Sequence, residues 1–105
     1  MAAPDRLTQL LSILESEPND AFCLYGVAQE YVRRGESLVA VAWFDRCLAA
    51  DPGHCYAYYH KAKALEDAGR EADAVATLRL GLAQAKAARD GQAISEIAAY
   101  LDQLT

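Results

Sequence analysis

Little in this sequence favours strands or insertion into a membrane. Among 105 residues, valine, isoleucine and threonine together supply only 11, whereas the helix-favouring alanine and leucine supply 22 and 13. No uncharged apolar run approaches the roughly 18 residues that a membrane span needs. A length near 100 residues fits one domain. We therefore expect a single all-α domain, covering residues 1–105, with no membrane partner.

Positive charge and cysteine are also scarce. Ten basic residues stand against 15 acidic ones, so the formal net charge is -5. Such a chain offers no electrostatic attraction to a phosphate backbone, and we expect no nucleic-acid partner. The first 17 residues lack the basic start and continuous apolar stretch of a secretory signal, and three cysteines are an odd number. These features predict a cytoplasmic protein with reduced thiols.

A period of 34 residues runs through the chain. Residues of similar size coincide when the sequence is shifted by that distance. The coinciding pairs include Leu24 with Tyr58, Ala28 with Ala62, Gly35 with Gly69, Ala40 with Ala74, Cys47 with Gly81 and Pro18 with Pro52. Because Pro18 matches the end of a unit, the segment before it is expected to be the second half of one.

The apolar residues of each unit have the spacing of helices that bury one face. In the first unit this stripe is Leu24, Val27, Ala28 and Tyr31. Glycines at 35 and 69 are expected to end the first helix of each unit, and a turn at Asp90 and Gly91 to precede a last helix. There the period lengthens to 36, so the expected stripe is Ile94, Ile97, Ala98 and Leu101.

These patterns predict six helices in four segments. A leading half-unit helix lies in 1–18, the first repeat covers 21–54, the second repeat covers 55–88, and a C-terminal capping helix covers 91–105. Alanine at 28, 62 and 98 is expected to allow close helix packing, while larger side chains fill the layers between helices.

The first unit resembles the tetratricopeptide repeat, whose pattern is W-x2-L-G-x2-Y, then A-x3-F, then P. Its matching residues are Leu24, Val27, Ala28, Tyr31, Ala40, Phe44 and Pro52. The second unit departs from the pattern at Lys61 and lacks the closing proline. The resemblance implies a right-handed α-solenoid of antiparallel helix pairs, with two full units and a half-unit helix at each end.

In proteins that this chain resembles, the first helix of each unit lines a concave surface on which a partner segment lies. We therefore expect a non-enzymatic scaffold, without a cofactor or metal, that binds a peptide or helix of a partner protein in an aromatic-lined groove. The expected groove residues are Phe22, Tyr25, Gln29, Arg33, Tyr56, Tyr59, His60 and Lys63, to which the last helix adds Gln92, Ser95 and Ala99. Two other interpretations are that the rings pack on one another or that the last helix covers them.

Some proteins of this fold hold the C-terminal carboxylates of chaperones with lysine, asparagine and arginine on successive concave helices. The comparable positions here are Tyr25, Gln29, Tyr59 and Lys63, so that clamp is not reproduced. Lys63 and Arg33 are candidates to meet an acidic group of a ligand, but Glu66 and Asp67 are expected to lie nearby and to satisfy them. Gly26 either admits the backbone of a partner or allows two helices of the chain to pack closely.

Two alternative functions remain open at this point. The first is a self-associating structural module, a homodimer formed through leucines of the terminal helices, namely Leu7, Leu11 and Leu14 or Leu101 and Leu104. The second is a thiol- or metal-dependent activity near Cys55 and His60. Cys55 is expected to be exposed after the Pro52-Gly53 turn, although the spacing of cysteine and histidine lacks the paired motif of a structural zinc site.

Overall fold

The computed structural model describes residues 5–105, which form six α-helices and no strand. The helices are α1 (Arg6–Ser16), α2 (Ala21–Arg33), α3 (Ser37–Ala50), α4 (Cys55–Asp67), α5 (Glu71–Ala88) and α6 (Gly91–Leu104). The all-α solenoid expected from the sequence is confirmed. The expected leading helix begins within the described residues, and residues 1–4 of its segment lie outside them.

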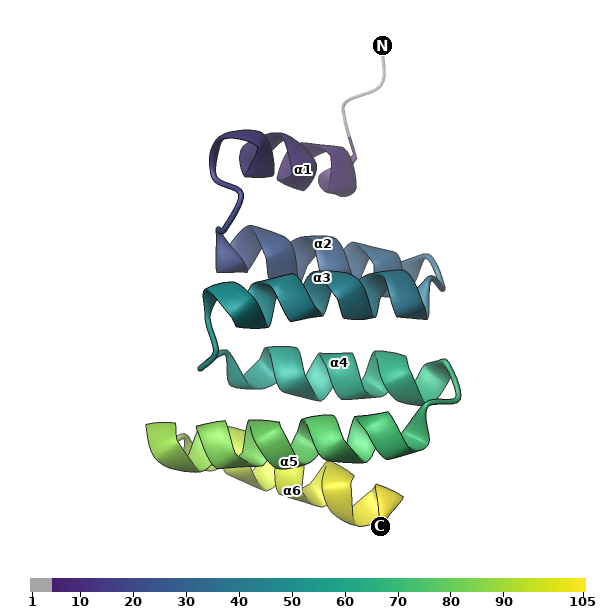
Figure 1. The fold of residues 1–105 in the computed structure, drawn as a ribbon, viewed down its shortest axis with the longest axis vertical. Helices are drawn as coiled ribbons and strands as arrows, with labels where there is room; N and C mark the ends of the chain where they lie inside the picture. Colours follow the sequence, from purple (N-terminus) through teal and green to yellow (C-terminus); the bar gives the residue numbers. More distant parts are fainter. Residues whose placement is uncertain (1–4) are drawn as a thin grey trace.

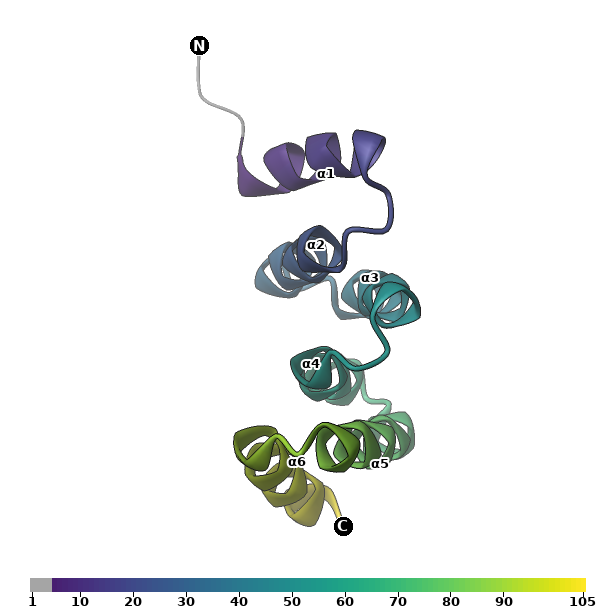
Figure 2. The same cartoon turned by 90° about the vertical axis from the view of Figure 1, so that its left-hand side faces the viewer.

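Successive helices stack along one direction and form antiparallel pairs (Figure 1). The most extensive pairings are α2 with α3 and α4 with α5. Helices α2, α4 and α6 lie on one side of the stack, and α3 and α5 lie on the other (Figure 2). Because α6 packs mainly on α5 and only slightly on α4, it continues the row of α2 and α4 and does not cover it.

Side chains at the starts of four helices satisfy backbone N–H groups that have no partner within the helix. Asp5, Asp20 and Asp90 each accept a hydrogen bond from the N–H three residues ahead, at 2.8, 3.0 and 3.1 Å. At the start of α4 an imidazole takes this role, since the N–H of Ala57 donates to Nδ1 of His54 at 3.2 Å.

Left-handed residues close three of the helices. Gly35 and Gly69 have φ values of 75° and 79°, as expected for glycines that end the first helix of each pair. The expected turn at Asp90 and Gly91 is placed differently. Arg89 takes the left-handed conformation, with φ of 54°, while Gly91 is the first residue of α6. Asp90 caps α6, so the turn lies one to two residues before the position that Gly91 had suggested.

The core consists of two clusters that meet at Val41 of α3. Phe44 lies in the cluster of α1 to α3, and its equivalent Leu78 lies in the cluster of α4 to α6; both are fully buried. Ala28 and Ala62 are also fully buried, as the repeat pattern predicts. Their counterpart in α6 is half-buried, because none of the described helices packs on that side of α6.

Two glycines mark places where neighbouring helices approach closely. A Cβ atom at Gly26 of α2 would lie 2.9 Å from Cδ1 of Leu10 in α1. A Cβ atom at Gly81 of α5 would lie 2.6 Å from Cβ of Tyr58 in α4. Helix packing therefore accounts for Gly26, and of the two explanations considered from the sequence it is the one that the structure supports.

Candidate partner-binding face

Two depressions open on the side of the stack that α2, α4 and α6 form, and we call this surface the α2–α4–α6 face. The first has a volume of about 350 Å³ and lies between α1 and α2. Its lining residues are Arg6, Phe22, Tyr25, Gly26, Gln29, Val32 and Arg33. The second has a volume of about 440 Å³ and lies between α4 and α6. Its lining residues are Tyr56, Tyr59, His60, Glu96, Ala99, Tyr100 and Gln103.

The structure brings all eight residues expected in the groove to this face. Phe22, Tyr25, Gln29 and Arg33 line the first depression, and Tyr56, Tyr59 and His60 line the second. The remaining residue, Lys63, holds its Nζ atom 5.7 Å from the centroid of the Tyr59 ring.

A row of rings connects the two depressions. The centroids of Tyr25 and His60 are 5.9 Å apart, those of His60 and Tyr59 are 5.3 Å apart, and those of Tyr59 and Tyr100 are 5.3 Å apart. These rings pack on one another, which was one alternative to an open aromatic groove. Phe22 differs from them because 72% of its surface is exposed. The row thus supplies a fixed wall, and Phe22 is the aromatic side chain left largely open to solvent.

Tyr25 is held in place from three directions. Its ring stacks on His54 at 4.7 Å and meets Phe44 edge-on at 5.8 Å, while Nε2 of Gln29 donates to its Oη atom at 3.0 Å. Burial raises the pKa of Tyr25 and lowers the pKa of His60, with the nearby charge of Lys63 acting in the same direction on His60. The rings of Tyr25 and His60 are therefore uncharged at neutral pH, and Lys63 supplies the charge beside them.

Acidic side chains lie at the α6 end of the face. The hydroxyl of Tyr100 donates to Oε1 of Glu66 at 2.6 Å. A hydrogen bond to Glu96 raises the pKa of Tyr56 to about 12, so this phenol also remains protonated. Because Glu66 accepts the bond from Tyr100, its carboxylate serves to join α4 to α6.

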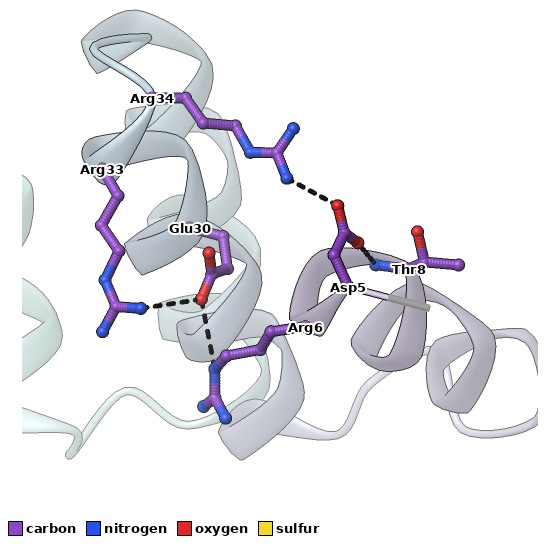
Figure 3. A network of polar contacts seen from close by, with 6 residues as sticks. All are labelled: Asp5, Arg6, Thr8, Glu30, Arg33 and Arg34. Carbon is purple, nitrogen blue, oxygen red and sulfur yellow. Dashed lines mark hydrogen bonds and ion pairs between the residues drawn. The ribbon is translucent and has the colours of Figure 1, made fainter. Parts of the chain in front are cut away.

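The α1 end of the face carries a different arrangement of charges (Figure 3). Nε of Arg6 and Nη1 of Arg33 lie 3.3 and 3.2 Å from the same oxygen, Oε1 of Glu30. Glu30 is only 8% exposed. A separate ion pair joins Nη2 of Arg34 to Asp5 at 3.0 Å. Arg33 thus pairs with Glu30 of its own helix. The sequence had suggested Glu66 and Asp67 as its partners instead.

The 34-residue period contains a signal for Glu30 that the sequence interpretation did not use. Glu30 coincides with Ala64 and, after the longer step of 36, with Tyr100. All three are buried, because this position faces the preceding helix in the stack. A glutamate buried at such a position requires cationic partners, and Arg6 and Arg33 meet that requirement from the solvent side.

The last helix contributes different residues from those expected. Ala99 lines the second depression as expected, but Gln92 and Ser95 do not. Their places are taken by Glu96, Tyr100 and Gln103. The buried stripe of α6 is Ala93, Ile97 and Tyr100, whereas Ile94, Ala98 and Leu101 of the expected stripe are half-buried. The expected stripe faces the side where a following helix would pack, and the described chain ends there.

The cysteines are buried in the helix core. Cys55 is 7% exposed, contrary to the expected exposure after the turn, and its Sγ donates to the carbonyl of Gly53 at 3.5 Å. Burial raises the pKa of Cys55 and raises that of Cys47 to about 11, so both thiols remain protonated. Within residues 5–105, no group of three or more histidine, cysteine, aspartate or glutamate side chains is placed to hold a metal ion.

The leucines named for self-association lie in or against the two core clusters. Leu7 and Leu14 are buried in the cluster that α1 forms with α2 and α3, and Leu11 packs against it. At the other end, Leu101 and Leu104 pack against the second cluster. In the part of the chain that the structure describes, no helix is long and apolar enough to cross a membrane.

The backbone closely matches helical-repeat proteins of known structure. The solution structure of a tetratricopeptide repeat domain protein from Salinibacter ruber has 29% sequence identity and a TM-score of 0.77, over 83% of this chain and 88% of that one. A crystal structure of a tetratricopeptide repeat domain protein from the same organism has 28% identity and a TM-score of 0.74, over 81% and 94%. The chain therefore has the fold of these small tetratricopeptide repeat proteins.

A third known structure shares this fold. It is the solution structure of a protein from Bordetella parapertussis, with 22% identity and a TM-score of 0.84 over 97% of this chain and 89% of that one. No family model matches the sequence, and no curated protein matches it. A tetratricopeptide repeat fold is typical of modules that mediate protein–protein interactions.

Proposed function

We propose that this tetratricopeptide repeat protein is a non-enzymatic interaction scaffold whose α2–α4–α6 face binds a peptide or helix of a partner protein. The observation that carries the proposal is Phe22, which lies 72% exposed at the rim of a depression beside a packed row of rings. Aromatic side chains lose little rotamer freedom on binding and bury a large area, which makes them frequent anchors at interfaces.

The division into repeats explains how this face is formed. We propose that residues 21–54 and 55–88 are the two full units, which present α2 and α4, and that 1–18 and 91–105 are half-units. In this arrangement α6 takes the place of the first helix of a third unit. It extends the binding face instead of capping it, which is supported by its place beside α4 in Figure 2.

Charge and thiol chemistry support a protein partner in the cytoplasm. The formal net charge of -5 disfavours a phosphate backbone. The three cysteines are free and buried, which fits a reducing compartment. The protonated thiols and the capping role of His54 also favour a scaffold over a thiol-dependent activity.

Selection of short peptides from a randomised display library tests the proposed face. The affinity of the selected peptides is then measured for the wild-type protein and for Phe22→Ala. We expect Phe22→Ala to weaken binding about tenfold or more, as for an aromatic anchor at the centre of an interface. Leu80→Ala is the matched control, because Leu80 of α5 is 63% exposed and lies outside both depressions.

Thermal unfolding of both variants establishes that each one is folded. Since both side chains are largely exposed, we expect melting curves close to that of the wild type. Peptides that lose affinity through Leu80→Ala and keep it in Phe22→Ala would place the binding site on the α3–α5 side and contradict the proposal. Failure to select any peptide would contradict it as well.

A further inference from the structure

The depression between α1 and α2 concentrates positive charge on an otherwise acidic protein. Arg6 and Arg33 both line it, and their side chains are 55% and 72% exposed. The carboxylate that they share, Glu30, is buried beneath them with 11% of its side chain exposed. Two guanidinium groups and one carboxylate leave a local charge of one positive unit, whereas the chain carries -5.

The two arginines retain hydrogen-bonding capacity toward solvent. Each guanidinium has several N–H donors in a planar fork that matches a carboxylate. The contacts with Glu30 involve Nε of Arg6 and Nη1 of Arg33 and converge on a single oxygen. Nη2 of Arg6 lies over Gly26, 3.6 Å from where a Cβ atom would be, so it stands over the floor of the depression. Figure 3 shows both side chains reaching Glu30 from opposite sides.

An apolar group adjoins these cations in the same depression. The exposed ring of Phe22 lines it together with Val32. A ligand that satisfies both parts must carry a carboxylate next to an apolar side chain. The phenol of Tyr25, which also lines the depression, stays neutral because burial raises its pKa, so it adds no repulsion toward an anion.

We propose that the α1–α2 depression binds a carboxylate of the partner peptide, carried by an acidic residue that is adjacent to an apolar one. This inference rests on the proposed function, because it names the ligand chemistry of the same face. The site uses α1, which precedes the two repeats. Its two cations, Arg6 and Arg33, lie outside the positions that hold carboxylates in chaperone-binding proteins of this fold, and the two such positions that line the depression are the uncharged Tyr25 and Gln29.

The other end of the face gives the bound segment a direction. Glu96 lines the second depression and Glu66 is bonded to Tyr100 in its wall, while Lys63 lies over Tyr59 beside it. The carboxylates disfavour an acidic residue of the partner at α6. The acidic residue of the partner is therefore expected at the α1 end.

Paired arginine variants test the inference on peptides selected from a randomised display library. Arg33→Gln and Arg34→Gln each remove one positive charge from neighbouring positions. Arg34 pairs with Asp5 and does not line the depression, so it is the matched control. We expect the selected peptides to be enriched in aspartate and glutamate, Arg33→Gln to weaken them about tenfold, and Arg34→Gln to change their affinity less than about twofold.

A change made in the peptide tests the same contact on the wild-type protein, so the result does not depend on whether a protein variant folds. Replacing the acidic residue of a selected peptide by its amide should weaken binding to the wild-type protein by a similar factor. It should also remove the loss of affinity that high salt causes. Arg33→Gln is expected to fold because Arg6 still pairs with Glu30, and its melting curve verifies this.

The outcomes separate this inference from the proposed function. Peptides that require Phe22 but show no acidic enrichment and no response to Arg33→Gln or to the amide overturn the carboxylate site and leave the binding face intact. Equal weakening by Arg33→Gln and Arg34→Gln would reveal an effect of net charge alone and also overturns the site. Peptides that are insensitive to Phe22→Ala contradict the proposed function itself.

Discussion

Gly81 of α5 faces Tyr58 of α4 at a distance that leaves no room for a methyl group. A Cβ atom at position 81 would lie 2.6 Å from Cβ and 3.0 Å from Cγ of the tyrosine. The ring cannot easily turn away, because its hydroxyl donates to the carbonyl of Pro52 at 2.8 Å. In the preceding helix pair the equivalent residues are Leu24 and Cys47. Compared with that pair, the second pair has a larger residue at position 58 and a smaller one at position 81.

Gly81→Ala is therefore expected to destabilise the protein. Overpacking of a rigid contact costs about 1–3 kcal/mol, while replacing glycine by alanine within a helix returns about 0.5–1 kcal/mol. The free energy of unfolding should fall by about 1–2 kcal/mol, and the melting temperature by about 5–15 °C for a domain of this size. Gly26→Ala is the control, because its close neighbour is the flexible end of Leu10. There the two effects should cancel to within about 0.5 kcal/mol.

Urea unfolding followed by circular dichroism measures both variants, as well as Tyr58→Gly and the double variant Tyr58→Gly/Gly81→Ala. Glycine at position 58 lacks the Cβ and Cγ atoms that the new methyl group would meet, so the double variant should be more stable than the sum of the single changes by about 1 kcal/mol. If Gly81→Ala proves as stable as the wild type, or if the two changes are additive, the contact between α4 and α5 is not as described.

Three further changes have expected outcomes that chemical denaturation can measure. Arg89→Gly should raise the free energy of unfolding by about 1 kcal/mol, because Arg89 has a φ of 54° that glycine adopts without strain; a decrease would refute this. Asp20→Ala should lower it by about 1 kcal/mol, whereas Glu36→Ala, which removes no capping bond, should not; equal effects would refute the role of the cap. Burial lowers the pKa of His60 below its ordinary 6.5, so its contribution to stability is complete above pH 6.5 and is lost as the pH falls toward the folded value; an unaltered pH slope in His60→Gln would refute it.

The helices were predictable because each one repeats a pattern that depends on local spacing. Apolar residues such as Leu24 and Ala28, together with Gly35, define where a helix is buried and where it ends, and residues of the same kind recur 34 positions later. The turn before α6 was less predictable. Arg89 adopts a left-handed conformation that its side chain does not favour. Because Gly91 is the glycine in this region, the sequence predicted the turn too late in the chain.

Part of the candidate binding face was also predictable. Helical spacing is enough to bring Tyr25 and Tyr59 to the same side of the stack. It does not establish that His60 bridges the two rings, because that depends on the distance between α2 and α4. The stacking of His54 on Tyr25 likewise depends on His54 being the cap of α4, a role more often taken by aspartate or serine.

The charged end of the face depends partly on a contact that no local pattern encodes. Arg6 and Glu30 are far apart in the sequence and meet because α1 packs on α2. The pair of Arg33 with Glu30 is local, because the two residues are three positions apart on α2, but the sequence interpretation named Glu66 and Asp67 of the next repeat as partners and did not consider Glu30. The buried position of Glu30, shared with Ala64 in the next pair, shows why the structure selects a different carboxylate.

The most direct test of the binding face is a map of amide chemical-shift changes upon addition of a selected peptide to the labelled protein. We expect the largest changes at Phe22, Tyr25 and Tyr59, on the side formed by α2, α4 and α6. Changes concentrated instead at Leu38 and Leu80, which are exposed on α3 and α5, would contradict the proposed binding face.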